Sequence, residues 1–118
     1  METKNAAQLL DALGHESRLA IYRLLVEAGS SGMSAGVIAE RLQLPAATLS
    51  FHLAHLGRVG LIHGRQESRY IFYAIDYGVM DALLDFLARD CCQGKMDCLP
   101  RSAQQLQRIS AESTHKGV

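Results

Sequence analysis

The sequence lacks the features that would mark a secreted, membrane-spanning or disulfide-stabilised protein. Its 118 residues contain no apolar run approaching the ~18 residues of a transmembrane helix. Residues 1–5 are mostly polar or charged and contain none of the apolar block of a signal peptide. The three cysteines all lie between positions 91 and 98, which favours a soft-metal site over a disulfide framework. We therefore expect a cytoplasmic protein with reduced thiols and no membrane association.

Motifs that would indicate an enzyme are also missing. The chain has no glycine-rich phosphate loop and no Cys-x-x-Cys redox pair. Neither Ser17 nor Ser50 has the sequence context of a nucleophile. We therefore predict that the protein is not an enzyme.

The chain has no net charge, which at first argues against a nucleic-acid partner. The charges are unevenly distributed, however, and their distribution matters more than their sum. Residues 41–75 carry four arginines against Glu67, whereas residues 76–97 carry two basic and five acidic side chains. Three of the five histidines also lie in the basic stretch. Residues 41–75 are therefore the candidate DNA-binding segment.

Hydrophobic periodicity predicts five helices in one domain. In the first helix, Ala7, Leu10 and Leu13 are expected on one face. Ser34 and Asp76 are expected to cap the third and fifth helices. The third and fourth helices are joined tightly enough to match a helix-turn-helix. The expected helices span residues 5–14, 16–28, 35–42, 44–56 and 77–92.

The fourth of these helices has the composition of a recognition helix. Pro45 suits its first turn, and Leu49, Leu53 and Leu56 share one apolar stripe. Small groups, hydroxyls, one aromatic ring and an imidazole face the other way, which suits the base edges of a major groove. This outward face carries Ala47, Thr48, Ser50, Phe51, His55 and Arg58.

After Leu61 the period changes to about 2, which predicts strands at residues 61–63 and 70–75. Arg65 and Arg69 lie at the tip between them. A basic hairpin beside a helix-turn-helix is typical of a wing whose arginines reach phosphates or the minor groove. The predicted fold is mostly α (α+β), a winged helix-turn-helix with five helices and a two-stranded wing. It spans residues 1–98 and is followed by a flexible tail over residues 99–118.

Several of the candidate DNA contacts have a second interpretation. His52 lies near the leucine stripe and is as consistent with helix packing as with a phosphate contact. Phe51 is either a thymine-methyl contact or a stray surface aromatic, and Arg65 and Arg69 are either phosphate contacts or solvated charges. Arg18 is interpreted as structural. The predicted DNA contacts are Ala47, Thr48, Ser50, Phe51, His52, His55, Arg58, Arg65 and Arg69.

The first and last helices carry more apolar surface than a small domain needs internally. In the last helix Val79, Met80, Leu83, Leu84, Leu87 and Ala88 recur at helical spacing. We interpret the surplus as the interface of a homodimer formed through these two helices.

These segments together resemble the ArsR/SmtB family of metal-responsive repressors over roughly residues 6–98. The matching motifs are LGHESRLAIYRLL at residues 13–25, IAERL at 38–42, SFHL at 50–53 and GLI at 60–62. The resemblance implies a homodimer that binds double-stranded operator DNA and releases it when an effector binds. The chain departs from the family in two places. It has no cysteine in residues 43–50, where many arsenic-responsive members carry Cys-x-Cys, and it has Ser68 where the wing tip often has glycine.

Cys91, Cys92 and Cys98 form the candidate metal site. Trivalent arsenic binds three thiolates in a pyramid, whereas structural zinc usually takes four ligands, and no histidine lies between His63 and His115. Neighbouring residues on a helix point about 100° apart, so Cys91 and Cys92 converge only where the helix ends or distorts. The spacing also resembles a subgroup of arsenic-responsive repressors. The expected effector is As(III), with Sb(III) as a further candidate, and no organic cofactor.

Four alternatives stay open for these residues and for the scaffold. The cysteines are packing residues, or they form a reversible disulfide switch. The bound metal is cadmium, lead or zinc. The winged helix binds another protein and not DNA. Asp81 and Asp85 share a helical face, but we expect that face to be solvated.

Overall fold

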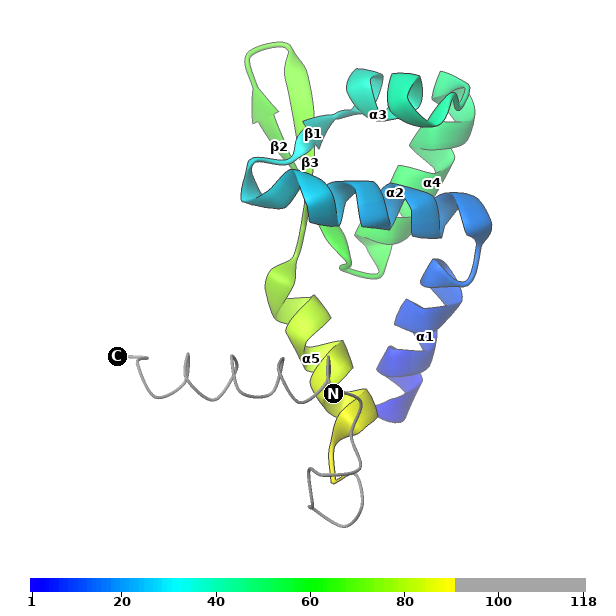
Figure 1. Ribbon diagram of the computed structural model, residues 1–118, viewed down its shortest axis with the longest axis vertical. Helices are drawn as coiled ribbons and strands as arrows, with labels where there is room; N and C mark the ends of the chain where they lie inside the picture. Colours follow the sequence, from blue (N-terminus) through cyan, green and yellow to red (C-terminus); the bar gives the residue numbers. More distant parts are fainter. Residues whose placement is uncertain (91–118) are drawn as a thin grey trace, which may run out of the picture. The chain divides into compact units, whose positions relative to one another are not determined.

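The structure, a computed structural model, describes residues 1–90, which fall into two compact units. Residues 2–80 form one unit, and the second begins at Asp81. The winged helix-turn-helix with five helices is confirmed, and within residues 1–90 no helix is long and apolar enough to cross a membrane. The elements are α1 (Thr3–Leu13), α2 (Glu16–Ala28), the 3-10 turn η1 (Gly29–Ser31), β1 (Met33–Ser34), α3 (Ala35–Leu42), α4 (Ala46–Arg58), β2 (Ile62–Glu67), β3 (Tyr70–Ile75) and α5 (Tyr77–Ala88), as Figure 1 shows.

Side-chain caps fix the starts of three helices. The Ser34 hydroxyl accepts a hydrogen bond from the Val37 N–H at 3.4 Å, and the Asp76 carboxylate accepts one from the Val79 N–H at 3.1 Å. Both predicted caps are therefore confirmed. His15 caps α2 in the same way, because its Nδ1 accepts the Ser17 N–H at 3.1 Å. Each cap satisfies a backbone donor that the first helical turn leaves without a partner.

The sheet has one more strand than the sequence predicted. Its order is β1-β3-β2, all antiparallel, so β3 lies between the wing's outer strand and β1 (Figure 1). Met33 pairs with Tyr73 and Ser34 with Phe72. A two-residue strand carries no detectable period of 2, so the prediction of a two-stranded sheet was incomplete.

The core of residues 2–80 forms where α2, α3, α4 and the sheet meet. The leucine stripe of α4 is buried as predicted, with Leu49, Leu53 and Leu56 each at most 3% exposed. Their burial, with that of side chains from the other elements, supplies the main stabilisation of the unit. The largest fully buried side chains are Ile21, Leu25, Ile38, Leu49, Leu56, Leu61 and Ile75.

The face of α1 that carries Ala7, Leu10 and Leu13 is not the face that the unit buries. The structure buries Ala6, Leu9 and Ala12 and leaves Leu10 43% exposed. The sequence holds apolar residues at both phases here, since Ala6-Ala7 and Leu9-Leu10 are adjacent pairs. Periodicity alone did not distinguish the two phases.

The end of α5 also differs from its predicted position. The helix ends at Ala88 and not at residue 92, and Asp90 has a left-handed φ of 58°. Because a left-handed residue is incompatible with a continuing α-helix, the helical path is interrupted before Cys91. The cysteine site, the predicted domain limit at residue 98 and the predicted tail all lie outside the described residues.

Candidate nucleic-acid interface

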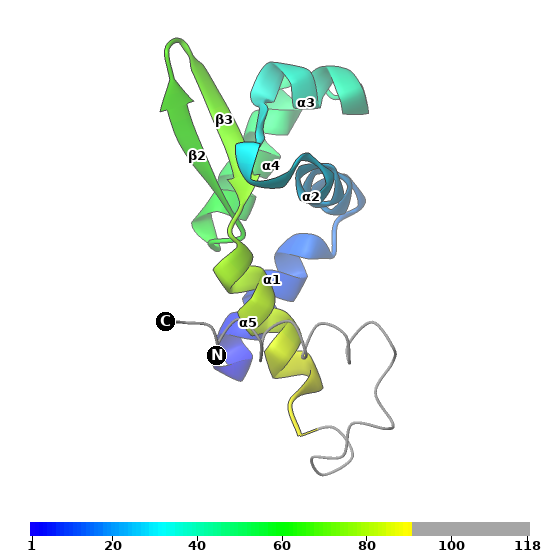
Figure 2. The same cartoon turned by 60° about the vertical axis from the view of Figure 1, so that its left-hand side comes forward.

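The helix-turn-helix and the wing lie next to each other in residues 2–80. Gln43, with a left-handed φ of 53°, ends α3 and lets the chain turn into α4. In Figures 1 and 2 the β2–β3 hairpin extends beside α3, in the direction of the N-terminal end of α4. Packing of α4 against β2 holds the helix and the hairpin together. This arrangement gives a helix and a hairpin that can contact one duplex together.

The outward face of α4 is exposed along its whole length. Ala47, Phe51, Ala54 and Arg58 recur at intervals of three and four residues, and all are exposed. Phe51 is 64% exposed, the largest fraction among the exposed large apolar side chains of the described residues. Thr48 and Ser50 flank this stripe and are also exposed. The predicted outward face is therefore available to a partner, apart from the half-buried His55.

His52 does not belong to this face, and of the two interpretations that the sequence left open, a phosphate contact and helix packing, its burial favours packing. It is 5% exposed, its Nδ1 lies 3.5 Å from Nη1 of Arg18, and its ring centroid lies 4.7 Å from that of His15. Burial, helped by the nearby His15, Arg18 and His55, lowers the pKa of His52 and favours its neutral form. At about 100° per residue, His52 lies about 130° around the helix from the centre of the exposed stripe, which places it on the packing side.

Arg18 has the structural role that the sequence indicated. Its Nε donates to the carbonyl of Ala12 at 2.6 Å, so it occupies an acceptor near the end of α1 while its Nη1 approaches His52 on α4. The side chain thus connects three helices. Sequence analysis missed the partner, because Arg18 and His52 are 34 positions apart and no local pattern joins them.

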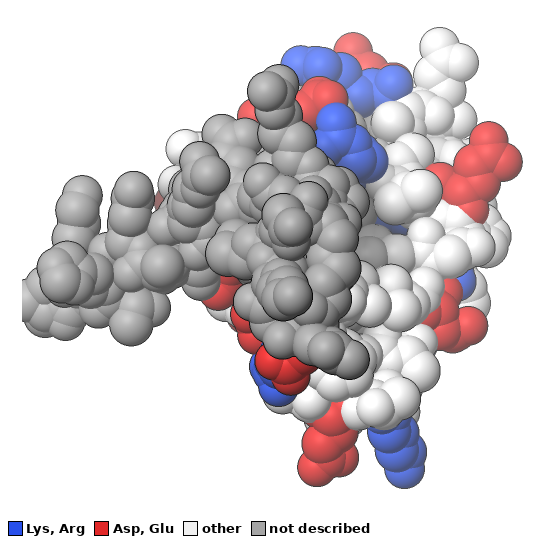
Figure 3. Space-filling model, turned by 60° about the horizontal axis from the view of Figure 1, so that its bottom comes forward, with Lys and Arg blue, Asp and Glu red and all other residues white. Residues whose placement is uncertain are grey.

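The arginines of the basic segment differ in how their charge is satisfied. Within residues 1–90, the side chain of Arg58 has no ion-pair or hydrogen-bond partner. The side chain of Arg69 contacts the Tyr70 ring, with its Cζ 5.8 Å from the ring centroid. Arg65 instead pairs with Glu67, its Nε lying 2.9 Å from the carboxylate. On the face shown in Figure 3, basic and acidic side chains are interspersed and no patch of one sign is visible.

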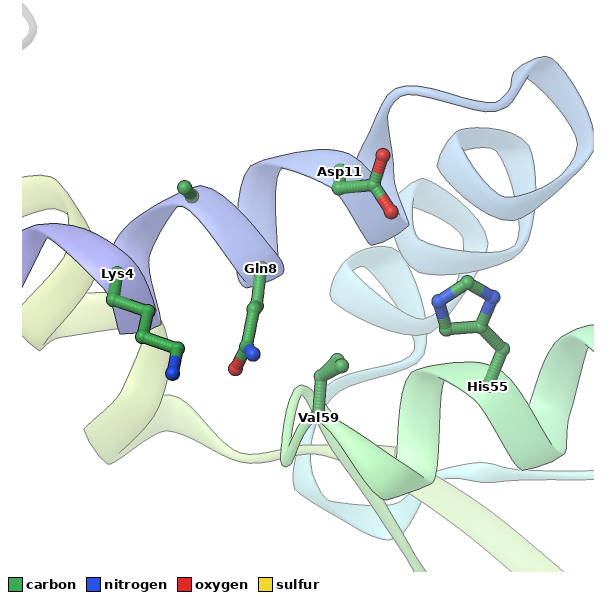
Figure 4. A pocket seen from close by; sticks show the side chains of 6 residues that line it. Lys4, Gln8, Asp11, His55 and Val59 are labelled. Carbon is green, nitrogen blue, oxygen red and sulfur yellow. The ribbon is translucent and has the colours of Figure 1, made fainter.

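His55 is half-buried and lies beside α1. It lines an open depression of about 460 Å³ between α1 and the C-terminal part of α4. Figure 4 shows its imidazole on the side where Gln8 and Asp11 project from α1. This position places His55 to one side of the outward stripe, and its contact with a phosphate or a base stays a prediction.

The turn at the wing tip keeps the backbone conformation that glycine would favour. Ser68 has a φ of 58°, so the chain adopts the left-handed turn with a residue that has a Cβ. The conformation is accessible to serine at a cost of about 1–2 kcal/mol. The chain therefore keeps this turn although it has Ser68 where the family often has glycine.

The described part of α5 contains no metal site. Asp85 is paired with Arg89 at 2.9 Å, as expected for a solvated face, and residues 1–90 contain no group of three potential metal ligands. The predicted ligands Cys91, Cys92 and Cys98 fall outside the described residues.

Comparison with known proteins identifies the family. A model described as a helix-turn-helix domain matches residues 13–65. The transcriptional activator HlyU of Vibrio cholerae is 37% identical over 93 residues, which cover 76% of this chain and 83% of HlyU. The transcriptional regulator YgaV of Escherichia coli is 35% identical over 89 residues, 75% of this chain and 88% of YgaV. The chain belongs to the ArsR/SmtB-type winged-helix regulators.

Solved structures of this family have the same fold. HlyU of V. cholerae superimposes with a TM-score of 0.62 at 36% identity, covering 79% of this chain and all of that one. A homodimeric winged helix-turn-helix DNA-binding domain from Mycobacterium bovis, a possible ArsR-family regulator, gives a TM-score of 0.59 at 26% identity, covering 78% and 85%. The chain is thus a DNA-binding transcriptional regulator and not an enzyme.

Proposed function

We propose that this regulator is a homodimeric repressor that releases its operator when trivalent arsenic binds Cys91, Cys92 and Cys98. The observation that carries the proposal is the position of the three thiols, directly after the described end of α5 and without a histidine among them. This donor set suits a soft ion that needs three sulfur ligands and does not suit tetrahedral zinc. Antimony in the same oxidation state shares this chemistry and is the second candidate effector.

The end of α5 removes a geometric objection to the site. Two adjacent cysteines on a regular helix would point about 100° apart and could not bind one ion. α5 ends at Ala88 and Asp90 is left-handed, so the regular helix ends before the cysteine segment begins. The end of α5 is thus compatible with the proposed site.

DNA binding is assigned to the exposed face of α4 and the wing. Ala47, Thr48, Ser50 and Phe51 present small and apolar groups suited to base edges. Arg58 and Arg69 carry charges without an ion-pair partner in residues 1–90 and suit phosphates. A dimer would present two such surfaces to successive major grooves, ~34 Å apart.

Effector binding must act on this spacing to release DNA. A hundredfold loss of operator affinity requires a coupling free energy of about 2.7 kcal/mol, within the usual range for allosteric proteins. The chain's own contribution is to hold the effector next to α5, the predicted dimer helix. A small change there shifts the two recognition helices relative to each other.

Two variants separate sensing from DNA binding. Fluorescence anisotropy with duplex DNA from upstream of the gene is measured with and without arsenite, in the presence of a non-thiol reductant. Cys92→Ser should bind DNA like the wild type and lose release, because only two thiolates remain. Arg69→Ala should bind more weakly yet keep the wild-type ratio between the two conditions. Release by arsenite that persists in Cys92→Ser would refute the proposed site.

A thiol-redox switch at the same cysteines is the second candidate. It is favoured by one observation, that a solved structure of the relative HlyU is described as reduced HlyU. Cys98 can pair with either Cys91 or Cys92, whereas two adjacent cysteines would form a strained ring. Titration of the protein–DNA complex with a thiol oxidant, in the absence of arsenite, distinguishes the two. Release by oxidant alone would favour this second function.

A further inference from the structure

The side chain of Arg65 crosses the wing sheet. Arg65 on β2 pairs in register with Phe72 on β3, and Phe72 pairs with Ser34 on β1, so the three residues form one row across the sheet. The guanidinium lies over Phe72, with its Cζ 5.8 Å from the ring centroid. Beyond it, Nη2 donates to the carbonyl of Ser31 at 3.1 Å. Arg65 therefore joins the outer strand of the wing to the turn that precedes β1.

The charge of Arg65 is also paired, on the surface of the wing, with another side chain of the same strand. Its Nε donates to the Glu67 carboxylate at 2.9 Å, two residues along the same strand. With Ser31, Glu67 and the Phe72 ring, the guanidinium has partners in three directions. To bind Arg65, a phosphate would have to replace the Glu67 carboxylate and break its ion pair. It would also draw the guanidinium away from Phe72 and the Ser31 carbonyl.

Arg69 offers a contrast on the same hairpin. It is exposed, it follows the left-handed Ser68, and within residues 1–90 it contacts the Tyr70 ring and forms no ion pair. Its charge is thus available to an anion. On this hairpin, Arg65 is therefore paired within the protein, whereas Arg69 has no ion-pair partner among residues 1–90.

We propose that Arg65 is a positioning residue that ties the wing to the η1 turn, and that Arg69 is the arginine of this hairpin that contacts phosphate. The tie matters for DNA binding because β2 is the outer strand of the sheet and has a single neighbouring strand, β3. The side chain of Arg65 adds a second link across β3. This inference rests on the DNA-binding function proposed above and assigns different tasks to two residues of that site.

Salt dependence distinguishes the two tasks. Each phosphate contact contributes about 0.9 to the slope of log affinity against log salt concentration. Anisotropy titrations of the full chain with a duplex are compared between about 50 and 200 mM salt. In the dimer Arg69→Ala removes one phosphate contact per protomer and should lower the slope by about 1.8, whereas Arg65→Ala should weaken binding about fivefold at every salt concentration without changing the slope.

The lysine variants are the matched controls. Lysine keeps the charge but cannot donate in two fixed directions as a guanidinium does. Arg69→Lys should therefore retain the wild-type slope. Arg65→Lys should bind as weakly as Arg65→Ala, again with the wild-type slope. Hydrogen exchange should show faster exchange in the wing strands of both Arg65 variants.

The possible outcomes separate the inference from the function. A wild-type protein without salt-dependent affinity for duplex DNA would refute the function itself. If the wild type binds, a slope reduced by about 1.8 in Arg65→Ala and restored in Arg65→Lys would make Arg65 a phosphate contact in both protomers and overturn the inference. Unchanged affinity in Arg65→Ala would equally overturn it.

Discussion

Replacing Gly32 tests how tightly the entry to β1 is packed against the sheet. Gly32 has φ 75° and ψ −167°, and a Cβ built there would lie 2.4 Å from the carbonyl oxygen of Tyr73. That neighbour is backbone in the central strand, so it cannot move aside as a flexible side chain would. Gly32→Ala should therefore cost conformational strain of about 1–3 kcal/mol and a further 1–3 kcal/mol from the forced contact.

Gly29 provides an internal control three residues earlier. Its backbone is nearly identical, with φ 76° and ψ −164°, but a Cβ there would meet nothing within 4 Å. Gly29→Ala pays the same conformational strain and gains the same restriction of the unfolded chain. Subtracting one variant from the other leaves the contact with Tyr73 alone, so Gly32→Ala should be less stable than Gly29→Ala by about 1–3 kcal/mol.

Urea denaturation measures this difference. All three proteins are unfolded at one fixed protein concentration, because dimerisation would make the stability depend on concentration. The slopes of free energy against urea should agree, so that the midpoints report stability. If both variants lost the same free energy of unfolding, the close approach of Gly32 to Tyr73 would not contribute to stability. The packing argument for this turn would then fail.

Two further predictions concern α4. Burial lowers the pKa of His52, so the imidazole binds a proton more tightly in the unfolded chain than in the folded protein. The stability that neutral His52 contributes is therefore full above pH ~6.5. It is lost as the pH falls through the folded-state pKa. Urea unfolding at stepped pH should show a smaller acid loss in His52→Gln than in the wild type; equal losses would contradict this. Leu56→Ala should lose about 2–5 kcal/mol of stability, whereas Phe51→Ala should change stability by no more than about 0.5 kcal/mol while weakening DNA binding. A stable Phe51→Ala with wild-type affinity for DNA would remove Phe51 from the interface.

The sequence predicted those parts of the fold that depend on local patterns. The leucine stripe of α4 and the caps at Ser34 and Asp76 depend on residues close together in the chain, and all three are confirmed. Paired apolar residues in α1 fit two faces equally well, so periodicity did not indicate which face the unit buries. The strand β1 was missed because two residues have no measurable period, and it exists through its pairing with β3.

The candidate site shows the same limit at the level of single side chains. Composition identified the exposed face of α4, because hydroxyls and small residues alternate there with buried leucines. It did not decide between packing and a phosphate contact for His52, since the partners Arg18 and His15 of this side chain come from distant parts of the chain. Nor did it distinguish Arg65 from Arg69, because the Ser31 carbonyl reaches Arg65 only in the folded sheet.

Both long-range ties hold an element of the DNA-binding surface. Arg18 links α4 to the end of α1 through His52 and the Ala12 carbonyl, and Arg65 links the wing to the η1 turn that follows α2. Each uses a guanidinium, whose donors point in fixed directions and can therefore set an orientation as well as a distance. Binding to two grooves at once requires the helix and the wing to keep a fixed geometry. The arginines that hold this geometry thus matter to DNA binding even where their own charge never meets a phosphate.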